Sequence, residues 1–247
     1  MKKIFFILVI VCVTIFVACE KSADSSAAIG TVGVGGSLAR FTIVNNYLYI
    51  ADDTKLKTYN ITNTSQPQFV SEVEVGQLIE TIYPYSDKLF LGGQQGMYIY
   101  SLTNPDRPVK LSQAVHVRAC DPVVAKDTFA FVTLRSGTRC GTATNALYTY
   151  GIGTITNPVL LNTLPLPNPK GLGYKDSTLF VACEDSGLAV INIKQSNAPI
   201  IKQYIKGNSF SDVICLGNTL VCLVKTGISL YDISNVNNIT LIKNIAN

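Results

Sequence analysis

The chain has 247 residues, including one histidine and no tryptophan, and its formal net charge is +4. Loss of residues 1–18 would remove Lys2 and Lys3 and no acidic residue, which lowers the net charge from +4 to +2. A chain so close to neutral, without a cluster of Lys and Arg, is not expected to bind nucleic acid. One histidine and no Cys-x-x-Cys pair leave no zinc site of usual spacing, so neither a metal nor a cofactor is predicted.

The N-terminal residues have the pattern of an export signal. Met1–Lys3 is basic, and Ile4–Ala18 is an uncharged apolar run that is too short to span a bilayer. The run stops directly before Cys19, and the small polar residues that follow suit a flexible tether. This arrangement resembles a bacterial lipoprotein signal, which implies cleavage after residue 18 and acylation of Cys19. The alternative is ordinary cleavage near Ala18 that leaves Cys19 as a free thiol.

Two short patterns recur along the rest of the chain. One is a run of β-forming residues, and the other is a run in which apolar and polar residues alternate. The alternating run is marked by residues spaced 41, 50, 41 and 40 positions apart: Tyr59, Tyr100, Tyr150, Ile191 and Tyr231. Such a period indicates a repeat architecture. Four of the five repeats also carry a proline before their last predicted strand: Pro67, Pro108, Pro158 and Pro199.

Each repeat contains four short predicted strands. In the first repeat they cover residues 39–44, 47–51, 56–61 and 69–75, with turns at Asn45-Asn46 and Asp52–Lys55. Four strands in about 41 residues is the size of a β-propeller blade, and no long helical period follows the signal.

We therefore predict an all-β chain with three parts: a lipoprotein signal peptide (1–18), a flexible tether (19–28) and a β-propeller of about five four-stranded blades (29–247). Ring closure is left open, because residues 29–34 and residues 239–245 could each supply an outer strand, and a sixth blade is not excluded.

The third repeat is interrupted. Its two patterns lie 21 positions apart, where the other repeats have 11 or 12, so an insertion of about ten residues, Leu134–Asn145, follows its second strand. In a blade, this loop and the loop entering the first strand lie on one face, which places Cys140 near Cys120. In an oxidising compartment these two are predicted to form a disulfide, the alternative being two free thiols. Three other cysteines are expected to be buried free thiols on strands: Cys183, Cys215 and Cys222.

The repeats resemble the LVIVD repeat family. The resemblance lies around the third strand, at Leu188–Asn192 and Ile228–Asp232, and extends over about residues 29–247. Further stretches resemble Bacteroidota lipoproteins that carry this domain: Cys120–Val123, Phe131–Gly137, Cys140-Gly141 and Asn168–Gly173. The resemblance implies a propeller, a lipid anchor and the Cys120–Cys140 bridge, but no chemistry, because those proteins are functionally uncharacterised. The chain departs from them at Lys170, where a histidine is expected.

Polar side chains are predicted to gather on the face that carries the insertion: His116, Arg118, Asp121, Arg135, Arg139 and Lys170. Since arginine offers a planar fork to carboxylates and phosphates, this face could bind an anionic or sugar-like ligand. The alternative is structural: Asp121 caps a turn, and Arg118 and Arg135 pair with neighbouring carboxylates. His116 has no evident nucleophile or orienting partner, so no catalytic residue is predicted.

Three function classes follow. The preferred one is a lipid-anchored, non-catalytic binding or interaction scaffold of the cell envelope, since loops on a rigid ring suit binding. The second is a glycan-binding surface lipoprotein, in which tyrosines would stack on sugars. The third is a polysaccharide-active lyase or hydrolase, but the acids at Asp52-Asp53 and Glu184-Asp185 are adjacent on turns and point apart. The expected partners are a membrane, through the lipid, and an unidentified protein or glycan. The outer membrane is the expected location, with its side left open.

Overall fold

The structure is a computed structural model that describes residues 36–115, 122–137 and 144–246. These ranges consist of strands, turns and irregular segments; they contain no helix, and hence none long and apolar enough to cross a membrane. Several predicted features lie outside the described residues: the signal peptide, the tether, Cys19, the extra strand at 29–34 and the Cys120–Cys140 disulfide.

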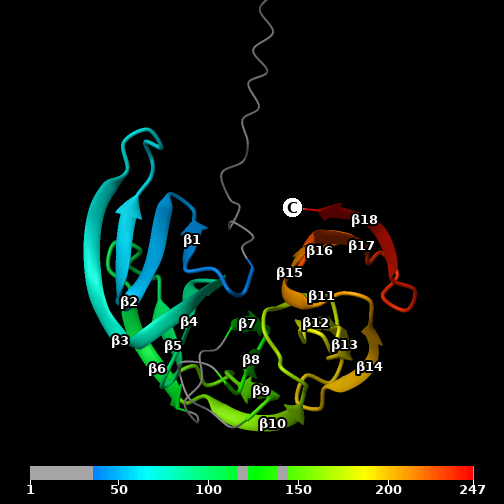
Figure 1. The fold of residues 1–247 in the computed structure, drawn as a ribbon. Coiled ribbons are helices and arrows are strands. Elements are labelled where there is room, and N and C mark those ends of the chain that lie inside the picture. Colours follow the sequence, from blue (N-terminus) through cyan, green and yellow to red (C-terminus); the bar gives the residue numbers. More distant parts are fainter. Residues whose placement is uncertain (1–35, 116–121, 138–143, 247) are drawn as a thin grey trace, which may run out of the picture. The chain divides into compact units, whose positions relative to one another are not determined.

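The strands form four antiparallel sheets (Figure 1). The first sheet holds six strands in chain order: β1 (Phe41–Val44), β2 (Tyr47–Asn60), β3 (Gln68–Tyr85), β4 (Lys88–Gly93), β5 (Gly96–Ser101) and β6 (Val109–Val115). The second sheet holds β7 (Val123–Lys126), β8 (Phe129–Leu134), β9 (Ala146–Gly151) and β10 (Val159–Pro165). The third holds β11 (Leu172–Lys175), β12 (Thr178–Ala182), β13 (Leu188–Asn192) and β14 (Ile200–Ile205). The fourth holds β15 (Phe210–Leu216), β16 (Thr219–Val224), β17 (Gly227–Asp232) and β18 (Thr240–Ala246).

The prediction of about five separate blades is wrong in its count, because the first two predicted repeats share the six-stranded sheet. β3 joins them: its first part pairs with β2, and its second part continues into the next repeat and pairs with β4. β2 in turn runs through the turn predicted at Asp52–Lys55, with Asp53 at a φ of 47°. The two ends of β2 meet, since the Ile61 amide donates to the Asn46 carbonyl at 2.8 Å. The all-β propeller arrangement itself is confirmed.

The later repeats follow the predicted pattern closely. A two-residue turn joins their first and second strands, and in the fourth sheet Cys215 pairs with Leu220 and Cys222 pairs with Val213. Each predicted proline stands directly before a strand, where its missing amide is harmless; the strands concerned are β3, β6, β10 and β14. β18 supplies the fourth strand of the last sheet and is exposed along its whole length, while the other candidate outer strand, at residues 29–34, lies outside the described residues.

A separate hydrophobic cluster lies between each pair of successive repeats. Between the second and third repeats, for example, Phe90 and Ile99 pack against Val132. Because the middle strands are covered on both faces, β8 and β12 are apolar except for one threonine each and are almost wholly buried. The first strands lie inside: β7 contacts β3, β4 and β11, and β15 contacts β11 and β12. Figure 1 shows β10, β14 and β18 on the outside.

The residues before β1 tie the first sheet to the last two. The Leu172 amide donates to Ser37 Oγ at 2.7 Å, and Ser37 is buried. The Asp212 carboxylate accepts hydrogen bonds from the Leu38 amide and the Ser37 hydroxyl, and burial raises its pKa to about 6. Gly171 makes room for this carboxylate, since a Cβ there would lie 1.8 Å from Asp212 Oδ1. The beginning of the propeller is thus fastened to its end by polar contacts near the innermost strands.

Candidate functional site

Two of the six residues predicted to share one face lie in the described ranges, and they lie together. Arg135 Nη1 is 3.2 Å from Glu184 Oε1, and Lys170 Nζ is 2.6 Å from the same oxygen. We call Arg135, Lys170 and Glu184 the charged cluster. The other four predicted residues lie outside the described residues: His116, Arg118, Asp121 and Arg139.

The charged cluster is assembled from three loops. Arg135 directly follows β8, Lys170 precedes β11, and Glu184 follows β12. Loops after a second strand and loops before a first strand therefore do meet on one face, as predicted. The backbone of Lys170 is fixed on both sides, because its amide donates to the Ala182 carbonyl at 2.7 Å and its carbonyl accepts from Thr133 Oγ1 at 2.6 Å.

Glu184 is held in an uncommon backbone conformation. Its φ is 46°, in a region that residues other than glycine seldom adopt. Two reciprocal backbone hydrogen bonds with Phe210, of 3.0 and 3.1 Å, fix it there, and Phe210 is fully buried. Conformations of this kind persist only where the surrounding structure determines them, and they are frequent at binding sites. The carboxylate position is thus set by the contact between the third and fourth sheets.

Arg135 stands at the base of the predicted insertion. The structure confirms that the insertion lies between β8 and β9. Its two ends are clasped, because the Ser136 amide donates to Asn145 Oδ1 at 2.9 Å and Asn145 Nδ2 donates to Ser136 Oγ at 2.8 Å. These two hydrogen bonds fix the backbone next to Arg135, so the arginine side chain extends from a rigid point of the loop.

The composition of the charged cluster suits binding better than catalysis. Two cations share one carboxylate, which leaves a net charge of +1, and all three side chains are partly exposed to solvent. The structural alternative for Arg135, pairing with a neighbouring carboxylate, is therefore observed, yet the pair stays accessible. Within the described ranges no three His, Cys, Asp or Glu side chains are grouped so that they could hold a metal ion.

The acids considered for catalysis have other partners. Asp53 pairs with Arg40 at 2.8 Å, and Asp52 pairs with Lys57, whose hydrogen bond and charge lower the pKa of the Asp52 carboxyl. Glu184 is the residue of this site that the sequence does not reveal, because beside Asp185 it has the pattern of two adjacent acids on a turn. Aligning the loops after the second strands of the third and fourth repeats would have placed it beside Arg135.

The three cysteines predicted to be free thiols are free in the structure. Cys183 and Cys222 are buried, whereas Cys215 is partly exposed, so the prediction of burial holds for two of the three. Burial raises the pKa of Cys183 and of Cys215 to about 12. Such thiols stay protonated at neutral pH and are poor nucleophiles.

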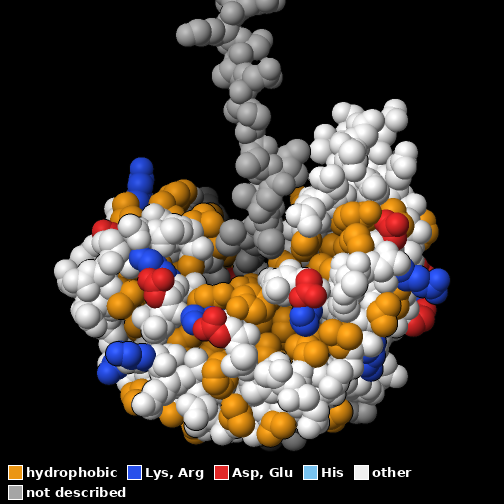
Figure 2. All heavy atoms as spheres, turned by 180° about the vertical axis from the view of Figure 1, so that it is seen from behind, with side chains coloured by type: hydrophobic (Ala, Val, Ile, Leu, Met, Phe, Trp, Pro, Cys, Tyr) orange, Lys and Arg blue, Asp and Glu red, His pale blue; other side chains and the backbone are white. Residues whose placement is uncertain are grey.

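Charges of both signs alternate on another part of the surface. Figure 2 shows one face of the molecule, on which the coloured basic and acidic side chains mostly lie beside one another around an area of hydrophobic side chains. Ion pairs between residues adjacent in the sequence also occur in the described ranges: Lys88 with Asp87, and Lys126 with Asp127. Paired charges of this kind do not form the one-sign field that would attract a polyanion.

Comparison with known proteins identifies the fold. No protein-family model matches the chain, and no curated protein matches it either. A functionally unknown protein from Desulfotomaculum acetoxidans superposes with a TM-score of 0.64 at 15% identity, over 81% of this chain and 66% of that one. A protein from Lactobacillus plantarum gives 0.63 at 13% identity, over 81% and 68%. The computationally designed Ika8 protein gives 0.60 at 12% identity, over 82% and 59%.

The chain thus spans between 59% and 68% of the length of these three proteins. At identities this low, structural likeness reflects a shared fold and carries no function with it. Together with the sheets described above, it identifies the chain as a β-propeller.

Proposed function

We propose that this chain is a lipid-anchored, non-catalytic binding scaffold of the cell envelope, and that its charged cluster captures a ligand bearing a carboxylate or a phosphate. The observation that supports this proposal is the convergence of Arg135 and Lys170, from separate loops, on one oxygen of Glu184. An oxyanion on a ligand can take the place that this carboxylate occupies, or join it.

The cluster is prepared for such an exchange. Arg135 and Lys170 are already held next to each other by backbone hydrogen bonds of their loops, so little side-chain or loop ordering is required on binding. The guanidinium offers parallel N–H donors to a carboxylate or phosphate, and the ammonium adds a point charge. Glu184 keeps the two cations together when the ligand is absent. Its carboxylate also competes with an anionic ligand for these cations and so weakens the binding of that ligand.

The ligand test uses two variants of opposite sign. Removal of both cations in Arg135→Ala/Lys170→Ala should abolish capture of acidic glycans on a glycan array. Glu184→Gln removes the competing carboxylate and should strengthen capture by about tenfold, the effect of one charge-assisted hydrogen bond. Lys225→Ala is a matched control, because Lys225 is an exposed lysine in the corresponding loop between β16 and β17.

Acidic and neutral glycans on the same array separate the outcomes. Capture of acidic glycans that is unchanged in the double variant would remove the charged cluster from the proposal. Retention of neutral glycans alone would favour stacking on tyrosines. Release of products from a polysaccharide by the wild-type protein, lost in Glu184→Gln, would favour the enzymatic alternative instead.

The anchor is proposed from the sequence pattern at Cys19, an apolar run followed by a cysteine and a polar tether. Cys19→Ala should move the protein from the membrane fraction to the soluble fraction of cells. If the variant stays in the membrane fraction, the lipid anchor is refuted. Protease treatment of intact cells then reports which side of the membrane carries the propeller.

A further inference from the structure

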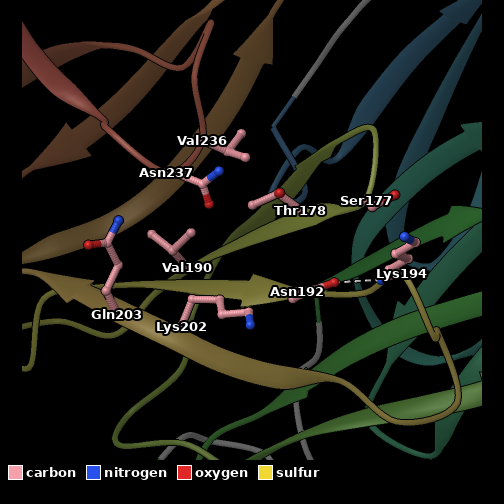
Figure 3. Close-up of a pocket in the computed structure, with 9 residues that line it drawn as sticks. All are labelled: Ser177, Thr178, Val190, Asn192, Lys194, Lys202, Gln203, Val236 and Asn237. Carbon is pink, nitrogen blue, oxygen red and sulfur yellow. Dashed lines mark hydrogen bonds between the residues drawn. The ribbon is translucent and has the colours of Figure 1, made fainter.

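A cavity of about 360 Å³ lies at the end of the strands opposite to the charged cluster. It opens between the third sheet and the loop that leads into β18 (Figure 3). β12 relates the two places: Thr178, at its start, lines the cavity, whereas Glu184 lies beyond its end. The lining consists of hydroxyls, amides, two lysines and two valines: Ser177, Thr178, Val190, Asn192, Lys194, Lys202, Gln203, Val236 and Asn237.

At the first two junctions of the propeller, a serine bridges the corresponding place. Between the first and second repeats, Ser71 Oγ donates to the Asp106 carbonyl. Between the second and third, Ser112 Oγ donates to the Ile155 carbonyl at 2.6 Å. In both cases a serine on the outer strand of one repeat donates to the loop of the next repeat. That loop leads into the outer strand of the next repeat. These two bonds hold successive repeats together at their edge.

Gln203 occupies the same position in the fourth repeat. Like the two serines, it pairs with the third-strand residue directly before the irregularity in the strand pairing, as these pairs show: Ser71 with Thr58, Ser112 with Ile99 and Gln203 with Val190. The Gln203 side chain forms no hydrogen bond with any described residue, and it lines the cavity instead. The serine bridge between repeats is therefore missing here, and the junction is open to a ligand.

The cavity also carries positive charge that no acidic residue of its lining neutralises. Lys194 and Lys202 are exposed lining residues, no acidic residue lines the cavity, and neither lysine forms an ion pair within the described part of the chain. In Figure 3 the two lysines lie on either side of Asn192. A cavity of about 430 Å³ at the junction of the second and third repeats is different, because its Lys88 pairs with Asp87 and its lining also includes an aspartate, Asp127.

The geometry points to a binding site for a hydroxylated small molecule that carries a carboxylate or a phosphate, such as an acidic or phosphorylated sugar. The two ammonium groups supply donors and charge for the oxyanion. Amide and hydroxyl groups from Asn192, Asn237 and Ser177 match ring hydroxyls, and Val190 and Val236 offer apolar surface to C–H groups. The side-chain oxygen of Asn192, Oδ1, accepts a hydrogen bond from the backbone amide of Lys194 at 2.8 Å, so the side-chain nitrogen Nδ2 of Asn192 is the group left for a ligand.

This site goes beyond the proposed function, because it uses none of the residues of the charged cluster. Calorimetric titration of the full-length protein in detergent at low salt tests it, with four probes: glucuronate, glucose 6-phosphate, glucose and inorganic phosphate. Glucuronate or glucose 6-phosphate should bind, and more tightly than either glucose or inorganic phosphate. Lys194→Ala/Lys202→Ala should weaken that binding by about tenfold or more, since two charge-assisted contacts are lost. The binding should also fall as salt is added.

Two variants isolate the cavity. Lys88→Ala removes a lysine from the cavity between the second and third repeats and should bind the probes as the wild type does. Arg135→Ala/Lys170→Ala lacks the cations of the charged cluster and measures how much of the binding belongs to that cluster. Because both lysines are exposed, the double variant should keep the wild-type unfolding temperature, which confirms that it folds. The proposal is overturned if no probe binds, if glucose binds as well as glucuronate and glucose 6-phosphate, or if binding survives the Lys194/Lys202 variant. Loss of binding only in the Arg135/Lys170 variant would assign the ligand to the charged cluster.

Discussion

The buried carboxylate of Asp212 should make the stability of the propeller depend on pH. Burial raises the pKa of Asp212 to about 6 in the folded protein, against an ordinary value of 3.8 that applies to the unfolded chain. Between these two values the folded protein binds a proton that the unfolded chain does not. This group therefore stabilises the fold fully below pH 3.8, and its contribution is lost as the pH rises through 6.

The size of the effect follows from the two pKa values. A difference of about two pH units corresponds to about 3 kcal/mol, of which about 2 kcal/mol should be lost between pH 4.5 and pH 7.5. Exposed carboxyls whose pKa is lowered by hydrogen bonds act in the opposite direction, but only at lower pH: Asp52, Asp87 and Asp232. Measurements that start at pH 4.5 keep the two effects apart.

The assay compares wild type with Asp212→Asn, which carries a neutral side chain of the same shape at every pH. Urea unfolding at pH 4.5, 5.5, 6.5 and 7.5 gives the free energy of unfolding of each protein. The wild type should lose about 2 kcal/mol relative to the variant over this range. Ser37→Ala removes a hydroxyl that donates to the carboxylate, so it should move the transition to higher pH. A difference between wild type and Asp212→Asn that does not change with pH would refute the reasoning.

Three further changes test the packing. Gly171→Ala should destabilise the fold by about 2–3 kcal/mol, because the new Cβ would lie 1.8 Å from Asp212 Oδ1, whereas Gly153→Ala, with its nearest atom at 3.8 Å, should be tolerated; equal urea midpoints would contradict this. Phe180→Ala should cost about 3–5 kcal/mol, since the ring is fully buried between the fourth and fifth repeats; calorimetry measures it. Cys183 should resist iodoacetamide at pH 8 until urea unfolds the chain, because its thiol is buried and protonated, and rapid labelling of the native protein would contradict that expectation.

Much of the fold could be predicted because the repeats carry the same local signals. The prolines before the outer strands and the turns between the first and second strands recur at a constant period, and the structure has strands where these signals place them. The count of sheets was missed at β3, where no turn residue separates the end of one repeat from the start of the next. Gly76 lies near that boundary and Leu78 has a φ of 47°, yet the strand continues, because its first part pairs with β2 and its second part with β4.

The sites were harder to predict than the strands, because they depend on contacts between repeats. Arg135 and Lys170 could be placed on one face from their positions in the third and fourth repeats, but their shared partner comes from a loop whose backbone is held by Phe210 of the fifth. The cavity lined by Lys194 and Lys202 also depends on a contact between repeats. At the first two junctions a serine bridges the repeats, whereas Gln203 stands at that position here. A period in the sequence indicates what the repeats share and so predicts the scaffold. The two proposed binding sites lie where a repeat departs from the shared pattern: at the base of the insertion after β8, at the strained turn of Glu184 and at the junction before β18, where Gln203 replaces the bridging serine.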